Sequence, residues 1–243
     1  MKQRQSGFTL VEIAIVLVII GLLLGGIIQG QQLINSARVK NLAETNSGVQ
    51  AAYFGFIDRY RQIPGDMDNT TANNAIGVTI AGGGNGNGRL DNDPTNTTTL
   101  FDENNGAWEQ LSKAGFIQGS YAGTSGEPLF NNNLAPVNAF NNPMLLGISD
   151  DYQDAGSAAV ASLHLVIGRG IPVQILRELD VKVDDGVPDT GVLRATVQTP
   201  SVFAGANNWG GSDAAVGCVN TTLNPSIYDV ASNSPDCNGV FIF

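Results

Sequence analysis

The longest hydrophobic run of the chain extends from Phe8 to Ile28, and Glu12 is the only charged residue in it. As a helix this run would be about 31 Å long, which is the thickness of the hydrocarbon core of a bilayer. Lys2 and Arg4 precede the run, so the positive-inside rule keeps that end in the cytoplasm and places the rest of the chain across the membrane. The pattern predicts one transmembrane helix.

Beyond residue 28 polar residues enter the chain, while apolar residues continue to recur at spacings of three and four. That period is typical of one face of an amphipathic helix. Pro64 ends the pattern, because the residue before a proline disfavours the α conformation. We therefore predict one long helix, with an amphipathic second half over 29–63. Its apolar positions are Leu33, Ile34, Ala37, Leu42, Val49, Ala52, Tyr53, Phe56, Ile57 and Tyr60.

The remaining residues, 64–243, predict a globular domain with long loops. Residues 64–104 are rich in Gly, Asn, Asp and Thr, which indicates a surface loop, with 76–80 as a candidate short strand. A short helix is expected over 107–115, with Trp108 as a packing residue.

Two later segments, 157–168 and 192–198, are apolar enough to be core strands, and Pro172 is well placed to open a short helix between them. The apolar tail 240–243 should be buried. The expected fold is α+β, in which the long N-terminal helix, transmembrane in its first half, packs against an antiparallel β-sheet domain.

The charge balance of the 243 residues is strongly acidic, with 22 acidic and 12 basic side chains and a net charge of −10. A nucleic-acid-binding protein needs a basic patch to contact phosphates, so nucleic acid is not an expected partner. The negative charge can instead serve solubility, repulsion between molecules or attraction of metal cations.

The segment SGFTLVEIAIVLVIIGLL resembles the N-terminus of type IV prepilins and type II secretion pseudopilins. In that family a prepilin peptidase cuts after the glycine and methylates the new amino terminus. The resemblance implies a leader of residues 1–7, cleavage after Gly7, methylation of Phe8 and an assembly role for Glu12. The helix would stay in the mature protein, with 8–28 as its transmembrane and assembly part.

Elementary electrostatics agrees with this interpretation, because a carboxylate is costly in an apolar helix unless it has a partner. Cleavage would create a positive amine at Phe8, available to Glu12 on the same chain or on a neighbouring subunit. An ordinary secretory signal has a shorter apolar stretch and a small-residue cleavage site after it, and a plain membrane anchor would not explain Glu12. Many pilins carry a proline near the end of the apolar stretch, where this chain has Gly25, Gly26 and Gly30.

Three further blocks resemble a subgroup of prepilin-type proteins. They are the turn 63–67, the tryptophan-containing stretch 108–117 and the acidic stretch 180–191.

The two cysteines, Cys218 and Cys237, lie near the C-terminus. If the body lies outside the cytoplasm, a disulfide between them would persist, whereas two free cytosolic thiols are the alternative. Closing this loop would contribute roughly 3 kcal/mol to stability. The family resemblance also implies a C-terminal disulfide loop.

Two stretches are candidate cation sites. Residues 85–91 resemble the middle of an EF-hand loop, but Gly83 stands where the first acidic ligand belongs and Pro94 where the glutamate belongs, which favours a glycine-rich turn. The second stretch has carboxylates that repel one another unless a cation or solvent separates them, so Ca²⁺ is a candidate ligand and a solvated acidic surface the alternative. These carboxylates are Asp180, Asp184, Asp185 and Asp189.

An enzyme is not expected, because His164 is the only histidine and lies in an apolar run that predicts a packed side chain. The predicted function is that of a structural subunit of a type IV pilus or a type II secretion pseudopilus. Expected partners are copies of the same chain and related pilins, prepilin peptidase, the inner-membrane assembly machinery and, before assembly, membrane lipid. The alternative is a surface adhesin or cation-binding module that uses a pilin-type anchor for export.

Overall fold

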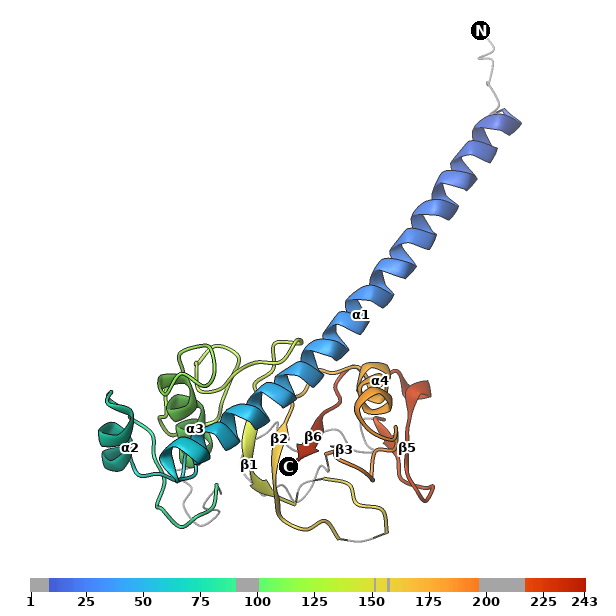
Figure 1. Cartoon of the computed structure of the whole chain (residues 1–243). Coiled ribbons are helices and arrows are strands. Elements are labelled where there is room, and N and C mark those ends of the chain that lie inside the picture. Colours follow the sequence, from blue (N-terminus) through green and yellow to red (C-terminus); the bar gives the residue numbers. More distant parts are fainter. Residues whose placement is uncertain (1–8, 91–100, 151, 157, 197–216) are drawn as a thin grey trace. The chain divides into compact units, whose positions relative to one another are not determined.

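The computed structural model of the chain forms two compact units, Met1–Arg38 and Val39–Phe243 (Figure 1). The predicted leader, with Gly7 and Phe8, lies outside the described residues, as does the end of the predicted strand 192–198. The described residues are 9–90, 101–150, 152–156, 158–196 and 217–243.

Helix α1, Leu10–Tyr60, is a single helix of 51 residues. In the first unit, every side chain from residue 9 to residue 29 is exposed. This stretch is apolar enough, with a mean hydropathy of 2.9 over 18 residues, to cross a membrane. The helix ends where Arg61 adopts a positive φ of 56°, three residues before the proline that predicted its end.

In the second unit, α1 buries one face of its remaining residues in the core. The predicted stripe begins too early, since Leu33 and Ile34 are 72% and 54% exposed. The buried face has the expected spacing of three and four residues from Val39 onward. Its members are Val39, Leu42, Val49, Ala52, Tyr53 and Phe56.

The main sheet has four antiparallel strands in the order β1-β2-β6-β3 (Figure 1). The C-terminal strand lies between two neighbours, so Phe241 pairs with Leu165 on one side and with Leu193 on the other. This position explains why Val240 and Phe241 of the apolar tail are buried, while Ile242 and Phe243 are partly buried. The strands are β1 (Leu145–Ser149), β2 (Ser162–Val166), β3 (Leu193–Ala195) and β6 (Gly239–Ile242).

A smaller sheet and a disulfide organise the C-terminal region. Strands β4, Val219–Asn220, and β5, Ile227–Tyr228, form an antiparallel pair. Cys218, directly before β4, forms a disulfide with Cys237, two residues before β6. A short helical turn, Val230–Ser232, follows β5.

Of the other three α-helices in the described residues, the sequence predicted the start of one correctly, missed one and placed the start of the third too late. Helix α4, Val173–Val183, begins after Pro172 as expected. Helix α2, Asn69–Ile76, lies inside the region expected to be a loop; Asp68 caps its first amides and Gly77, with φ 81°, ends it. Helix α3, Asp102–Lys113, begins well before the expected residue 107, because its first turns are polar and carry no apolar period.

One large core connects these elements. It contains Phe56 of α1, Trp108 and Leu111 of α3, and Leu146 and Leu165 of the sheet, all fully buried. A long helix and an antiparallel sheet sharing one core confirm the predicted α+β fold.

Candidate functional site

The start of α1 is organised by Thr9 and Glu12. The backbone N–H and the hydroxyl of Thr9 both donate to Glu12 Oε2 at 2.8 Å, and the Glu12 amide donates to Thr9 Oγ1 at 3.3 Å. This reciprocal pattern is a capping box, in which a threonine and a glutamate three residues later satisfy each other's backbone amides. The sequence Thr-x-x-Glu carries that signal, which the charge of Glu12 alone does not reveal.

The side chains that follow Glu12 form a long apolar surface on an exposed helix. Leu17, Leu22 and Leu23 are more than 60% exposed, for example. Monomeric soluble proteins rarely expose an apolar patch of this extent, so the segment requires lipid or protein around it.

A family model for the prokaryotic N-terminal methylation motif matches residues 2–28. The chain carries a prepilin-type signal. This match confirms the resemblance seen in the sequence, and it covers the basic leader, Gly7, Phe8, Glu12 and the apolar run. No curated protein and no solved structure matches the chain.

The signal and the apolar helix together fit membrane anchoring. Cleavage after Gly7 and methylation of Phe8 remain predictions, because both residues lie outside the described part of the chain. Glu12 is described, and its carboxylate accepts the amide of Thr9, the residue that follows Phe8 in the sequence.

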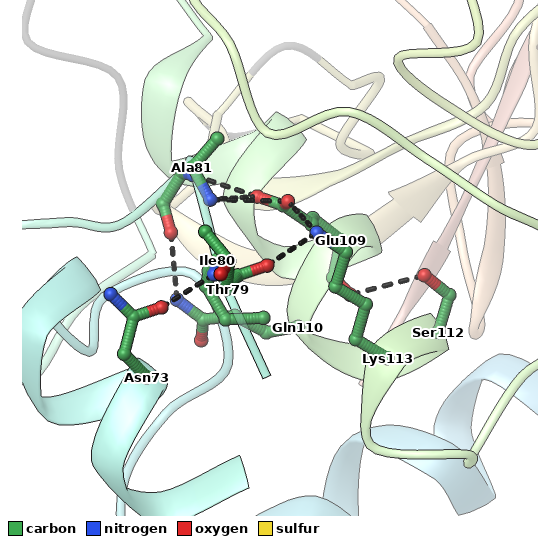
Figure 2. A network of polar contacts seen from close by, with 9 residues as sticks. Asn73, Thr79, Ile80, Ala81, Glu109, Gln110, Ser112 and Lys113 are labelled. Atoms are coloured by element: carbon green, nitrogen blue, oxygen red, sulfur yellow. Dashed lines mark hydrogen bonds and ion pairs between the residues drawn. The ribbon is translucent and has the colours of Figure 1, made fainter. Parts of the chain in front are cut away.

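Helix α3 is unusual because its buried face is largely polar (Figure 2). Glu109 is 1% exposed, and its carboxylate accepts the backbone N–H groups of Ala81 and Gly82 at 2.9 and 2.7 Å. Lys113, one turn later, donates to the same carboxylate at 2.6 Å and to the carbonyl of Thr79 at 2.6 Å. The buried charge is therefore paired and hydrogen-bonded, which makes its burial tolerable.

Ala81 and Gly82 belong to the glycine-rich loop that follows α2, and a second α3 side chain also contacts this loop. Gln110 accepts the Gly65 amide at 2.8 Å and donates to the carbonyls of Met67 and Gly82 at 2.9 and 3.2 Å. The glycines are required by close approach, since a Cβ on Gly82 would lie 2.3 Å from the carbonyl oxygen of Gly123. The proline-glycine-aspartate turn, the loop and the tryptophan helix, which the sequence showed as separate blocks, thus form one structure.

The loop that resembled an EF-hand is arranged around a carboxylate of this chain. Asp66 accepts the backbone N–H groups of Asn87 and Gly88, each at 2.9 Å. Asn85 and Asn87 each cap an amide two residues further on. These contacts show that the Asn-Gly repeats form turns, as the interpretation of a glycine-rich turn predicted. Pro94, which stands where the glutamate of an EF-hand would be, lies outside the described residues.

Three of the four predicted metal-ligating aspartates lie together at the end of α4. Each of Asp180, Asp184 and Asp185 has a carboxylate oxygen within 4.8 Å of the others. Asp189 is not part of this group and instead accepts the Ser226 amide at 2.8 Å. The geometry reduces the predicted set to three acids.

Protein donors already orient these carboxylates. Asp180 accepts the Tyr228 hydroxyl at 2.7 Å and the Gly186 amide at 3.1 Å, and Asp184 accepts the Leu193 amide at 2.9 Å. A carboxylate has about four lone-pair sites, so these contacts do not exhaust its capacity. Calcium binding here stays a prediction.

Burial raises the pKa of Asp180 to about 6, with smaller contributions from the charges of Asp185 and Asp184, although the Tyr228 and Gly186 hydrogen bonds oppose the shift. Burial, together with the charge of Asp180, also places the pKa of Tyr228 well above its usual value. At neutral pH the surroundings of Asp180 therefore disfavour its ionised form.

His164 is fully buried on β2, as its apolar surroundings predicted. Its Nε2 lies 3.0 Å from Ser149 Oγ on β1, and burial lowers its pKa to about 4. A neutral histidine paired with one serine inside a sheet contributes packing and a cross-strand hydrogen bond.

Proposed function

We propose that this chain is a structural filament subunit, belonging to a type IV pilus or a type II secretion pseudopilus. It is stored in the bacterial inner membrane with its body outside the cytoplasm, cut by prepilin peptidase between Gly7 and Phe8, and methylated at Phe8. The observation that carries the proposal is the methylation motif over residues 2–28, followed directly by an apolar helix.

Polymerisation is proposed to occur through the first part of α1, where the apolar side chains of the first unit are exposed. In the membrane lipid covers them, and in a filament the helices of other copies or related pilins take its place. Glu12 is the one charge in this surface. Once Phe8 carries a free amine, Glu12 can pair with it on its own chain or on the next subunit, and pairing fixes the register between subunits.

N-terminal mass spectrometry of the protein from a host with the peptidase tests the processing step. The expected mature chain begins with N-methylated Phe8. An intact Met1 in such a host would contradict the proposal. Electron microscopy of sheared cell-surface material then distinguishes long pili from a short periplasmic pseudopilus.

A surface binding module is the second candidate, and the gathered carboxylates of Asp180, Asp184 and Asp185 favour a cation as its ligand. Oxygen ligands on a turn suit Ca²⁺. Calcium titration of the metal-free protein, followed by thermal unfolding, measures whether the ion stabilises the fold. Stabilisation that is lost in Asp185→Asn would support this candidate, whereas an unchanged unfolding temperature would count against it.

A further inference from the structure

The second unit has a cleft beside α1, with a volume of about 360 Å³. Helix α1 lines it with Gly48 and Val49, α3 lines it with Trp108, and the segment after α3 contributes Phe116 and Tyr121. Among the described residues that line the cleft, none carries a charge. A concave surface with aromatic and aliphatic walls is suited to receive an apolar group.

Gly48 leaves the α1 side of this cleft open. A Cβ at this position would have no heavy atom of the described body within 4 Å beyond its own helix backbone. The residue lies inside the continuous helix α1, where glycine is a poorer helix former than alanine, so the helix itself does not require it. The glycine therefore provides room for a group from outside the chain.

A turn of the same body presents two large apolar side chains to solvent. Leu129 and Phe130 are 48% and 60% exposed. Asn132 closes this turn, because its Oδ1 accepts the Leu129 amide at 2.9 Å and its Nδ2 donates to the Glu127 carbonyl at 2.8 Å. The turn is thus held in one conformation before it meets a partner, which lowers the entropy cost of binding.

The charge of the chain favours contact between these two surfaces of different copies. A net charge of −10 makes the copies repel one another. Segment 128–149, which contains the turn, has no charged residue, and the described lining of the cleft has none either. Like charges that face each other destabilise an interface, so two acidic bodies meet most favourably where both are uncharged.

We propose that the Leu129–Phe130 turn of one copy inserts into the cleft beside α1 of the next copy. The Phe130 ring then lies among aromatic side chains, which gives more than the burial of area alone. Turn and cleft are different surfaces of one chain, so the contact is head-to-tail and builds rings or open helical filaments instead of two-fold pairs. This inference rests on the proposed function, since it adds a contact between bodies to the contact between the helices of a filament.

Disulfide cross-linking of sheared filaments tests the contact. The two cysteines of the chain are bonded to each other, so introduced cysteines are the free thiols. Asn131→Cys labels the turn and keeps both apolar side chains, and Gln118→Cys labels the lining of the cleft. Cells that express both single variants should give cross-linked dimers, and a chain with both substitutions should give a ladder of multimers. Val181→Cys, at a side chain that is 55% exposed on α4, replaces Asn131→Cys in the control and should give no such dimer.

Two further substitutions act on opposite sides of the contact. Phe130→Ala removes the inserted ring and should lower the cross-linked fraction by about tenfold. Gly48→Leu fills the cleft from within and should lower it as much, while leucine favours the helix more than glycine does, so the fold is kept. Val160→Ala shortens a side chain that is 72% exposed and lines neither surface, and it should leave the cross-linked fraction unchanged.

The inference and the proposed function fail in different ways. Filaments without the cross-link, a cross-link formed only within one chain, or wild-type cross-linking in both Phe130→Ala and Gly48→Leu would overturn the inference and leave the filament proposal standing. Wild-type cells without filaments would contradict the proposed function. The same cross-link is then measured in the membrane fraction, where anchored copies are concentrated, and its absence there overturns the inference as well.

Discussion

At the scale of single residues, Glu12 combines two roles that are usually separate. Its carboxylate caps the first turn of α1 through Thr9, and it is also the only charge in a long apolar surface. Capping alone would be a local contribution to the helix, whereas a charge partner in another subunit would matter only in the filament. The two roles can be separated by substitution, since Thr9 shares the first and not the second.

Glu12→Ala is expected to leave cleavage after Gly7 intact and to abolish or strongly reduce filament yield, because the charge that we propose to pair with the Phe8 amine is lost. Thr9→Ala weakens the same cap and keeps that charge, so its filaments should form. Immunoblotting of the processed chain and electron microscopy of sheared filaments measure the two steps. Equal yields from both variants would show that Glu12 acts only as a cap.

The raised pKa of Asp180 predicts that the stability of the fold depends on pH. The pKa is about 6 in the folded state, so protonated Asp180 contributes fully to the free energy of unfolding below about pH 4, and this contribution is lost as the pH rises through 6. Asp180→Asn imitates the protonated carboxyl, and it should match wild type near pH 4 and exceed it near pH 7 by about 1 kcal/mol, after allowance for solvent screening. Urea unfolding across this range measures the difference.

A matched control for that measurement is Asp58→Asn, because the side chain of Asp58 is 83% exposed. Its stability relative to wild type should show little pH dependence between 4 and 7. A constant difference between Asp180→Asn and wild type over this range would contradict the assigned role of Asp180.

At the scale of elements, periodicity predicted those parts whose side chains meet a purely apolar core. It found α1, the strand around Leu165 and the buried tail that became β6. It placed the start of α3 too late, because Glu103, Asn104 and Glu109 are buried by hydrogen bonds rather than by hydrophobic contact. It missed β1, whose neighbours come from distant segments, and it could not tell that Asp189 turns toward Ser226.

Two helices offer the same Glu–Lys pair in different surroundings. Glu109–Lys113 on α3 and Glu178–Lys182 on α4 are both separated by four residues, at 2.6 and 2.7 Å. The first glutamate side chain is 2% exposed and the second 37%. Glu109→Ala should lower the free energy of unfolding by roughly 3–5 kcal/mol, since it leaves the amides of Ala81 and Gly82 without their acceptor and removes the carboxylate that pairs with Lys113.

Glu178→Ala should cost less than about 1 kcal/mol, as is usual for exposed pairs. Denaturant unfolding of both variants gives the comparison. Similar losses in the two would mean that burial of the α3 network does not contribute to the stability of the glycine-rich loop.

At the scale of the whole molecule, the chain divides within a continuous helix. The buried positions of α1 begin at Val39, where the second compact unit begins, and none of the described residues 9–38 belongs to the main core. One helix thus belongs to two environments: its first part is an apolar surface that requires other molecules, and its last part is a component of a folded body. The body therefore should not depend on the assembly segment for its stability.

This division predicts that a chain of residues 39–243 folds by itself, is monomeric without detergent and unfolds cooperatively. A chain of residues 61–243 should not fold, because it lacks the six buried side chains of α1. At about 1.5–3 kcal/mol for each large apolar side chain, their loss amounts to on the order of 10 kcal/mol, comparable with the whole stability of a domain. Circular dichroism and urea unfolding compare the two chains. A folded 61–243 chain would show that α1 only lies on the body, whereas an unfolded 39–243 chain would show that the body needs the assembly segment.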